Sequence, residues 1–345
     1  MKKNKPRIKS SAFFWETAEM FLNYELPAIR KKSPNTISSY RVSLNAYIDF
    51  LEDFKNNNRA DVCFEDFNKD NLKDYLLWMD KSKKWKAKTC NLRMTAIRSL
   101  LSFASEESVD ITSVFVASKN VKGIMVPATR IEYLENYQLA ALLSAPNICE
   151  KKERRNQTML IVSYNAALRI SELISLKVGD FHFNAEIPYV SILGKGSKYR
   201  NMPLMNKTII HLKKYLAEFH VDMDLCKPFF YVVTHGKMHS LSDDAAQNVL
   251  KKYVGRCRDK NVHMPEYIHF HMLRKTRAMD LYQSGCPLSY IQQMLGHESI
   301  STTSGFYAFA TLDTLADALE KANPNSNDNE KIWKSEETIK KLYRL

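Results

Sequence analysis

The sequence predicts a mainly α-helical protein with a small antiparallel β-sheet, arranged as a helical domain followed by a mixed α/β domain. Three observations support this prediction. Apolar residues recur every three or four positions through roughly the first hundred residues, which is typical of amphipathic helices. That periodicity lapses between about 109 and 130, and two short strand-like segments stand among the later helices. A chain of 345 residues with 45% hydrophobic content has enough apolar surface for a core in each domain.

The helical domain is expected at 11–112, after a basic arm at 1–10. Four periodic apolar segments predict its helices, at 14–22, 40–51, 72–79 and 92–101. The second helix has a clear start, because Ser33 or Asn35 is available as an N-cap and Pro34 is acceptable in a first turn. This domain is therefore predicted to be a compact four-helix unit.

A change of pattern marks the next part of the chain. The segment 113–130 contains β-branched residues, a Gly and a Pro, and predicts an extended linker between domains. The second domain is expected at 131–323, with helices at 136–145 and 153–177, strands at Tyr189–Leu193 and Tyr199–Pro203, and then mostly helices. The tail at 324–345 begins with a polar hinge and regains helical spacing. We expect it to form a helix that docks on a neighbouring protomer; the alternative is a helix folded back on its own domain.

Composition restricts the partners. Lys and Arg number 51 against 38 Asp and Glu, and the net charge of +13 favours a polyanion such as nucleic acid. No run approaches the roughly 18 apolar residues of a spanning helix, and the basic start lacks the apolar region of a secretory signal. The six cysteines show no CxxC spacing, which argues against a disulfide framework or a zinc ribbon. A cytoplasmic protein with no membrane partner is expected.

Two segments of the second domain carry candidate residues that have ordinary structural explanations when taken singly. The stretch 166–180 reads as an apolar helix, where Arg169 needs a buried partner and Glu172 lies on the same face. A structural ion pair would explain both residues. The stretch 190–204 predicts two strands joined by a Gly-Lys-Gly turn that places Lys195 at the tip, where a solvated lysine is equally expected.

Two later segments add histidines, an arginine and a tyrosine. His271 and Arg274 are three residues apart and share a helical face. Metal binding by His269 and His271 is disfavoured, because residues two apart do not share a face and no third ligand is suitably spaced. Further on, Gly296 can end a helix, and His297 and Tyr307 follow it. A capping histidine and a core aromatic are the structural alternatives for these two.

Taken together, the four segments resemble the tyrosine recombinase (phage integrase) family. LRISEL, HMLR and LGHESISTT closely match motifs of that family and occur in its order. The family places a helical core-binding (SAM-like) domain before its catalytic domain, so the resemblance covers nearly the whole chain and implies a C-shaped clamp around DNA. It implies that activation comes from Arg169, Lys195, His271, Arg274 and His297. It further implies that Tyr307 is the nucleophile and Glu172 an accessory organiser of the site.

The residue types suit that chemistry on their own terms. Two guanidiniums can bind phosphoryl oxygens bidentately, which suits Arg169 and Arg274 to stabilising the charge that develops during attack. His271 is a plausible general base for a phenol, and His297 a donor to a phosphoryl oxygen. Lys195, among other cations, can protonate the departing 5′-oxygen. A 3′-phosphotyrosyl ester would store the cleaved bond, so neither ATP, a metal nor another cofactor is expected, and the sequence shows no phosphate loop.

One spacing departs from the family pattern. The family tyrosine is expected nine residues after the histidine of LGH, whereas that position is Phe306 and Tyr307 is the tenth. A one-residue insertion at Ser304-Gly305 would restore the geometry, because glycine is conformationally permissive. The alternative is that Phe306 occupies the place of the nucleophile and the chain is inactive.

The predicted function is site-specific DNA recombination, for integration, excision or resolution. Double-stranded DNA is the expected partner, bound mainly through its phosphates. A homo-oligomer is also expected, a dimer on one site and a tetramer on paired sites, with an accessory DNA-bending protein as a further candidate partner. Two alternatives remain open: a type IB topoisomerase-like enzyme, which would share the chemistry, and a non-catalytic DNA-architectural protein, which would share only the charge and the helices.

Overall fold

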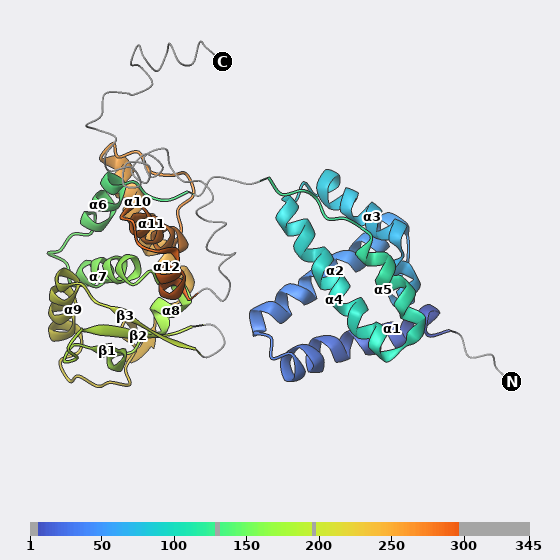
Figure 1. The fold of residues 1–345 in the computed structure, drawn as a ribbon, viewed down its shortest axis with the longest axis horizontal. Coiled ribbons are helices and arrows are strands. Elements are labelled where there is room, and N and C mark those ends of the chain that lie inside the picture. The colour runs from blue at the N-terminus through green and yellow to red at the C-terminus, as the bar shows by residue number, and fades with distance from the viewer. Residues whose placement is uncertain (1–5, 128–131, 195–197, 297–345) are drawn as a thin grey trace, which may run out of the picture. The chain divides into compact units, whose positions relative to one another are not determined.

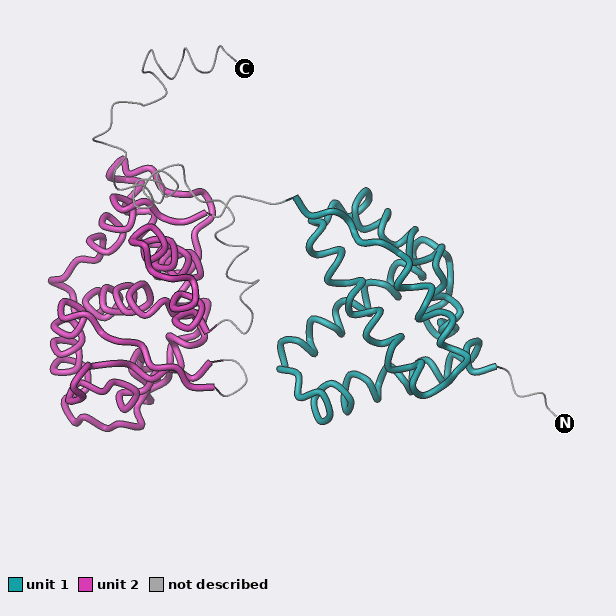
Figure 2. The backbone as a smooth tube through the Cα atoms, in the orientation of Figure 1, with its two compact units in different colours: residues 1–129 teal, residues 130–345 magenta. Residues whose placement is uncertain are grey.

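The computed structural model describes residues 6–127, 132–194 and 198–296, and the chain divides into two compact units (Figure 2). Unit 1 comprises residues 1–129 and unit 2 residues 130–345. Helices dominate both units, and the strands of the described chain lie in unit 2 (Figure 1). The prediction of a mainly helical protein with a small antiparallel sheet is confirmed.

Unit 1 is built from helices that follow the predicted periodic segments. They are α1 (Ser11–Met20), which continues as a π-helical segment (Phe21–Ile29), α2 (Pro34–Lys55), α3 (Lys69–Leu77), which continues as a π-helical segment (Trp78–Ser82), α4 (Ala87–Glu107) and α5 (Thr112–Lys119). The start of α2 is as predicted, with the Ser33 hydroxyl accepting from the Thr36 amide and Pro34 in the first turn. Aromatic rings, including those of Tyr47, Phe50 and Tyr75, pack against one another in the core.

The prediction of an extended linker over 113–130 is wrong in its first part, because Thr112–Lys119 is helix α5. This helix packs on α4 and buries Val114 and Ser118 in unit 1. Arg98 of α4 donates from Nε to the Ser118 carbonyl, 3.2 Å away, and from Nη2 to the Val121 carbonyl. Its side chain therefore supplies hydrogen-bond donors to carbonyls at and just after the C-terminal end of α5. Tertiary packing therefore overrides the low helix propensity of the β-branched residues in this segment.

Unit 2 combines helices with two small antiparallel sheets. Its elements are α6 (Asn136–Ser144), α7 (Lys151–Asn165), α8 (Ile170–Ser175), β1 (Phe181–His182), β2 (Tyr189–Leu193), β3 (Tyr199–Pro203), α9 (Asn206–Phe219), β4 (Tyr231–Thr234), β5 (Lys237–Ser240), α10 (Asp243–Asp259), α11 (Phe270–Gln283) and α12 (Leu288–Leu295). The sheet order is β1-β2-β3, with β4 and β5 forming a separate hairpin. Strands β2 and β3 have the predicted bounds, and a core that includes Phe229 and Phe230 connects the sheet with the helices.

Two expectations for unit 2 need correction. The helix predicted at 153–177 is two helices, because the chain leaves α7 at Asn165 and Ala167 takes a left-handed conformation with φ 48°. The mostly helical segment predicted after β3 contains the β4–β5 hairpin as well. At its turn His235 and Gly236 both have positive φ, which matches the twist of a tight hairpin.

The remaining expectations concern cysteines and membranes. All six cysteines lie in the described ranges and are free thiols. No helix of the described ranges is long and apolar enough to cross a membrane. The basic arm expected at 1–10 is wrong in its described part, because Arg7–Lys9 is a short 3-10 helix and Ile8 packs against the core of unit 1. Residues 1–5 and the tail at 324–345 lie outside the described residues.

Candidate active site

Four of the predicted site residues come together in unit 2. Arg169, Glu172, His271 and Arg274 are described, and they are contributed by the start of α8 and the first turns of α11. Lys195, His297 and Tyr307 lie outside the described residues, so their predicted roles remain predictions.

Arg169 stands at the break between α7 and α8 rather than inside a continuous helix. Its backbone is extended (φ −71°, ψ 152°) at the N-cap of α8, and Glu172 is the third helical residue. The Glu172 carboxylate accepts from the Arg169 backbone amide at 2.9 Å and from Arg169 Nη1 at 2.6 Å. The predicted Arg169–Glu172 pair is therefore present, but a helix-capping arrangement holds it rather than a shared helical face.

Arg274 is almost completely buried, with 2% of its side chain exposed. It donates from Nη1 to the Ala167 carbonyl at 2.8 Å and from Nη2 to the Leu295 carbonyl. These acceptors lie in the break before α8 and at the end of α12, so Arg274 joins three helices at one point. A buried guanidinium needs such partners, since an unpaired buried charge is strongly unfavourable.

Glu172 is the shared anion of the site. It is 5% exposed, and three cations face it: Arg169, Arg200 of β3, and Arg274, whose Nη1 is 3.8 Å from Oε2. Burial alone would raise its pKa, but the hydrogen bonds and charge of Arg200 and the contacts from Arg169 outweigh burial and lower the pKa to about 2. Glu172 is therefore ionised at neutral pH and balances part of the positive charge around it.

Arg200 is a residue of this cluster that the sequence reasoning missed. Its Nη1 lies 2.9 Å from Glu172 Oε1, and its Nη2 lies 2.7 Å from Oε2. The predicted hairpin could have indicated Arg200. This residue pairs with Ile192, and cross-strand partners point to the same face of a sheet. Ile192 is fully buried, so an arginine opposite it requires a buried acid.

His271 lies in the first turn of α11, three residues before Arg274. His271 is exposed, yet partial burial of its ring and the positive charges of Arg274 and Lys275 lower its pKa to about 4. The imidazole is therefore neutral at neutral pH and has a nitrogen able to accept a proton. Within the described part of the chain no group of three or more His, Cys, Asp or Glu side chains is placed to hold a metal ion.

Gly296 ends α12, as predicted from the LGH motif. It has φ 57° and closes the helix with hydrogen bonds from its amide to the carbonyls of the last turn. Its own carbonyl is 3.5 Å from Arg169 Nη2, and a Cβ added here would lie 3.4 Å from Arg200. Gly296, the last described residue of this motif, therefore lies directly beside the arginine cluster.

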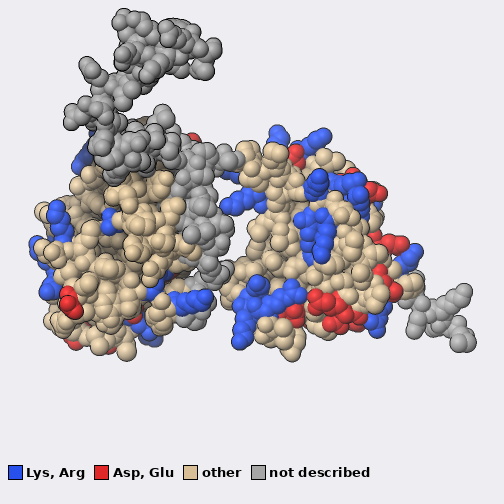
Figure 3. All heavy atoms as spheres, viewed as in Figure 1, with Lys and Arg blue, Asp and Glu red and all other residues tan. Residues whose placement is uncertain are grey.

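Positive charge extends beyond this cluster. Lys and Arg side chains form several patches on the visible faces of both units, with acidic side chains more localised (Figure 3). This distribution agrees with the net charge of +13 and provides contacts for a phosphate backbone.

This geometry matches one class of enzyme. Arg169 is the most exposed of the arginines around Glu172, and a guanidinium beside a neutral histidine is suited to binding a phosphodiester and accepting the proton of an attacking hydroxyl. The fold and the site are therefore those expected of an enzyme that breaks and joins phosphodiester bonds.

Comparison with known proteins identifies the family. Residues 132–311 match the phage integrase family, and residues 19–108 match the phage integrase N-terminal SAM-like domain. The chain is 30% identical to tyrosine recombinase XerD of Staphylococcus epidermidis strain RP62A, over 83% of this chain and 91% of XerD. It is 28% identical to XerC of the same strain, over 90% of this chain and 98% of XerC. The chain therefore belongs to the phage integrase family and is a site-specific DNA recombinase.

The fold comparison agrees. The crystal structure of the XerH site-specific recombinase bound to a palindromic difH substrate is similar, with a TM-score of 0.63 at 21% identity. The similarity covers 90% of this chain and 84% of the XerH chain. The family match favours recombination over the topoisomerase-like and architectural alternatives.

Proposed function

We propose that this recombinase cleaves and rejoins double-stranded DNA through a 3′-phosphotyrosyl intermediate formed on Tyr307. The observation that carries the proposal is the convergence of Arg169 and Arg274 on the ionised Glu172, with His271 close enough to both arginines for their charge to lower its pKa. An arginine cluster with a neutral histidine suits a reaction in which a hydroxyl attacks a phosphodiester. We assign DNA core binding to the predicted helical domain extended by α5, and catalysis to the predicted domain 131–323.

The proposed cleavage step conserves atoms and charge. The Tyr307 hydroxyl attacks the phosphorus, the bond to the 5′-oxygen breaks, and a phosphotyrosyl ester remains on the 3′ side. His271 accepts the phenolic proton, and Lys195 donates a proton to the departing 5′-oxygen. Arg169, Arg274 and His297 stabilise the charge on the non-bridging oxygens.

Rejoining reverses these roles. A 5′-hydroxyl of another strand attacks the phosphotyrosyl ester, and Tyr307 leaves with its proton returned. The bond energy is retained in the ester, so the proposed exchange does not require ATP, a metal ion or another cofactor.

The DNA is proposed to lie against the basic patches of both units (Figure 3). The similar XerH was solved bound to its difH DNA substrate, which supports this partner. Phosphate contacts by Lys and Arg would supply most of the affinity and make it depend on salt, with a few base contacts determining the site.

A covalent capture experiment tests the proposal. The protein is incubated with fragmented DNA from its own cell that carries nicks, so that a cleaved end diffuses away and rejoining fails. Protein-linked DNA is then isolated under denaturing conditions and sequenced. We expect one sequence to be enriched; no covalent adduct on any DNA would contradict the proposed chemistry.

Assembly is the second part of the proposal. A dimer on one site and a tetramer on paired sites is proposed, in which the tail at 324–345 docks on a neighbouring protomer and an accessory protein bends the DNA. The support is the helical spacing of Ile332, Trp333, Ile339 and Leu342 beyond a polar hinge.

Truncation after Asn325 is expected to leave single-site binding intact and to remove assembly on paired sites, because the tail would be the link between protomers. Electrophoretic mobility shifts on one-site and two-site DNA measure both effects. Unchanged assembly on two-site DNA would show that the tail docks on its own domain.

A further inference from the structure

Arg200 makes the most complete contact with Glu172 among the arginines described around it. Its two terminal nitrogens engage the two carboxylate oxygens, at 2.9 Å and 2.7 Å. Arg169, in contrast, reaches only Oε1 with its side chain, and Arg274 lies 3.8 Å from Oε2. A bidentate contact fixes the plane of a carboxylate, so Arg200 orients Glu172 together with the Arg169 amide, which donates to Oε2 at 2.9 Å.

The location of Arg200 connects three elements of the site. It belongs to β3, its carboxylate partner belongs to α8, and its Cδ and Nη1 lie against Gly296 at the end of α12. The side chain is only 11% exposed, compared with 32% for Arg169. Arg200 is therefore enclosed by the protein, whereas Arg169 faces outward, where a phosphate can reach it.

We propose that Arg200 is a positioning residue for recombination, which fixes the Glu172 carboxylate and through it the guanidinium of Arg169. The proposal rests on the proposed function, since it assigns Arg169 to the scissile phosphate. Without Arg200, Glu172 keeps the contacts from the Arg169 amide and Nη1 but loses its bidentate partner, so its carboxylate can shift toward Arg274. Arg169 then loses a fixed anchor, and a displacement of about 1 Å in a group that binds the reacting phosphate can slow a reaction roughly 100-fold.

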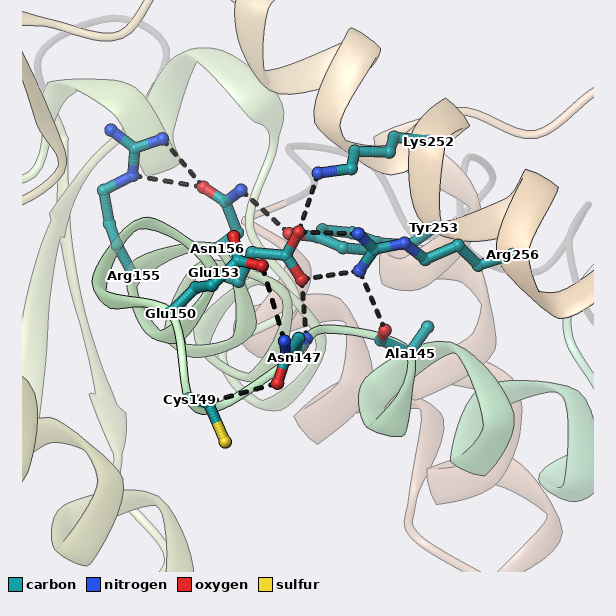
Figure 4. A network of polar contacts seen from close by, with 10 residues as sticks. All are labelled: Ala145, Asn147, Cys149, Glu150, Glu153, Arg155, Asn156, Lys252, Tyr253 and Arg256. Carbon is teal, nitrogen blue, oxygen red and sulfur yellow. Dashed lines mark hydrogen bonds and ion pairs between the residues drawn. The ribbon is translucent and has the colours of Figure 1, made fainter.

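The same unit contains a matched control. Glu153 of α7 is 2% exposed and receives a bidentate contact from Arg256 of α10, at 2.5 Å and 2.7 Å (Figure 4). Lys252 and the Asn147 backbone amide also donate to the Glu153 carboxylate. The pKa of Glu153 is lowered to about 2, and the hydrogen bond from Arg256 is the largest cause. The contacts that the structure gives for Arg256 all lie outside the Glu172 cluster.

The test compares Arg200→Met, Arg200→Lys and Arg256→Met in the full chain. Single-turnover cleavage is measured at saturating concentration on a nicked duplex that carries the captured site, together with DNA affinity and the thermal unfolding midpoint. We expect Arg200→Met to slow cleavage by about 10- to 100-fold with DNA affinity unchanged. Arg200→Lys should recover part of the rate, because lysine keeps the charge but not the fork. Arg256→Met should lower the unfolding midpoint and leave the cleavage rate as in the wild type.

A double-mutant cycle with Glu172→Gln identifies the route of the effect. If Arg200 acts through Glu172, the double variant is about as slow as the slower single variant. Multiplied effects, a wild-type rate in the Arg200 variants, or an equal loss of rate in Arg256→Met would each overturn the inference. A weakened affinity with a reduced salt slope would also overturn it, since that result marks a direct phosphate contact. If the wild-type protein forms no adduct, the proposed function fails first, so the two failures are distinguishable.

Discussion

Tyr307→Phe is expected to bind DNA as the wild type does and to form no covalent adduct. Phenylalanine preserves the ring but has no hydroxyl to attack phosphorus, so the effect on cleavage should be complete. The measurement uses a suicide DNA substrate whose cleaved fragment diffuses away, followed by denaturing electrophoresis of the protein–DNA adduct. Peptide mapping of the wild-type adduct then identifies the modified residue.

The spacing makes this prediction informative. Phe306 stands at the ninth position after His297 and Tyr307 at the tenth, and between His297 and the end of the domain at 323 Tyr307 is the only phenol in the sequence. Tyr290 is a suitable control, because it is 64% exposed on α12 and its change to Phe should leave the adduct unaffected. An adduct mapped to Tyr282, Tyr290 or Tyr343 would overturn the assignment of Tyr307.

The pairing of Arg169 with Glu172 illustrates how far sequence reasoning reached. An arginine in an apolar segment needs an acid, and Glu172 was the available one. The predicted local structure was wrong, because periodicity suggested one helix at 153–177. The break before α8 is stabilised by the hydrogen bond from Arg274 to the Ala167 carbonyl, which spans 107 positions in the chain. A contact of that range leaves no trace in local periodicity.

Strong local patterns were reliable elsewhere. Strands β2 and β3 have the predicted bounds, and Gly296 ends a helix as the motif indicated. Helix α5 was missed because its stability depends on burial against α4 and on the side chain of Arg98. Arg200 was missed for a related reason. The contact between Arg200 and Glu172 can be inferred only from the folded hairpin, whose register places Arg200 opposite the buried Ile192 and within reach of Glu172.

Lys195→Ala is expected to keep DNA binding and to slow cleavage by roughly 10²–10⁴, the usual contribution of general acid catalysis. The 5′-oxygen is a poor leaving group without a proton, and Lys195 is the proposed donor on the segment between β2 and β3. A substrate with sulfur at the 5′-bridging position tests this role, because a thiolate leaves without protonation. Cleavage by Lys195→Ala should therefore return close to the wild-type rate on the sulfur substrate.

Arg169→Ala provides the comparison that gives this rescue its meaning. Arg169 is proposed to stabilise charge on the non-bridging oxygens, so its loss should cost on the order of 10² or more in rate on both substrates. Replacing the leaving oxygen by sulfur does not remove the charge that builds on those oxygens, and no rescue is expected. If the sulfur substrate restores Arg169→Ala as well, the rescue reports general reactivity of the substrate. If it fails to restore Lys195→Ala, then Lys195 is not the acid, and another group must protonate the 5′-oxygen.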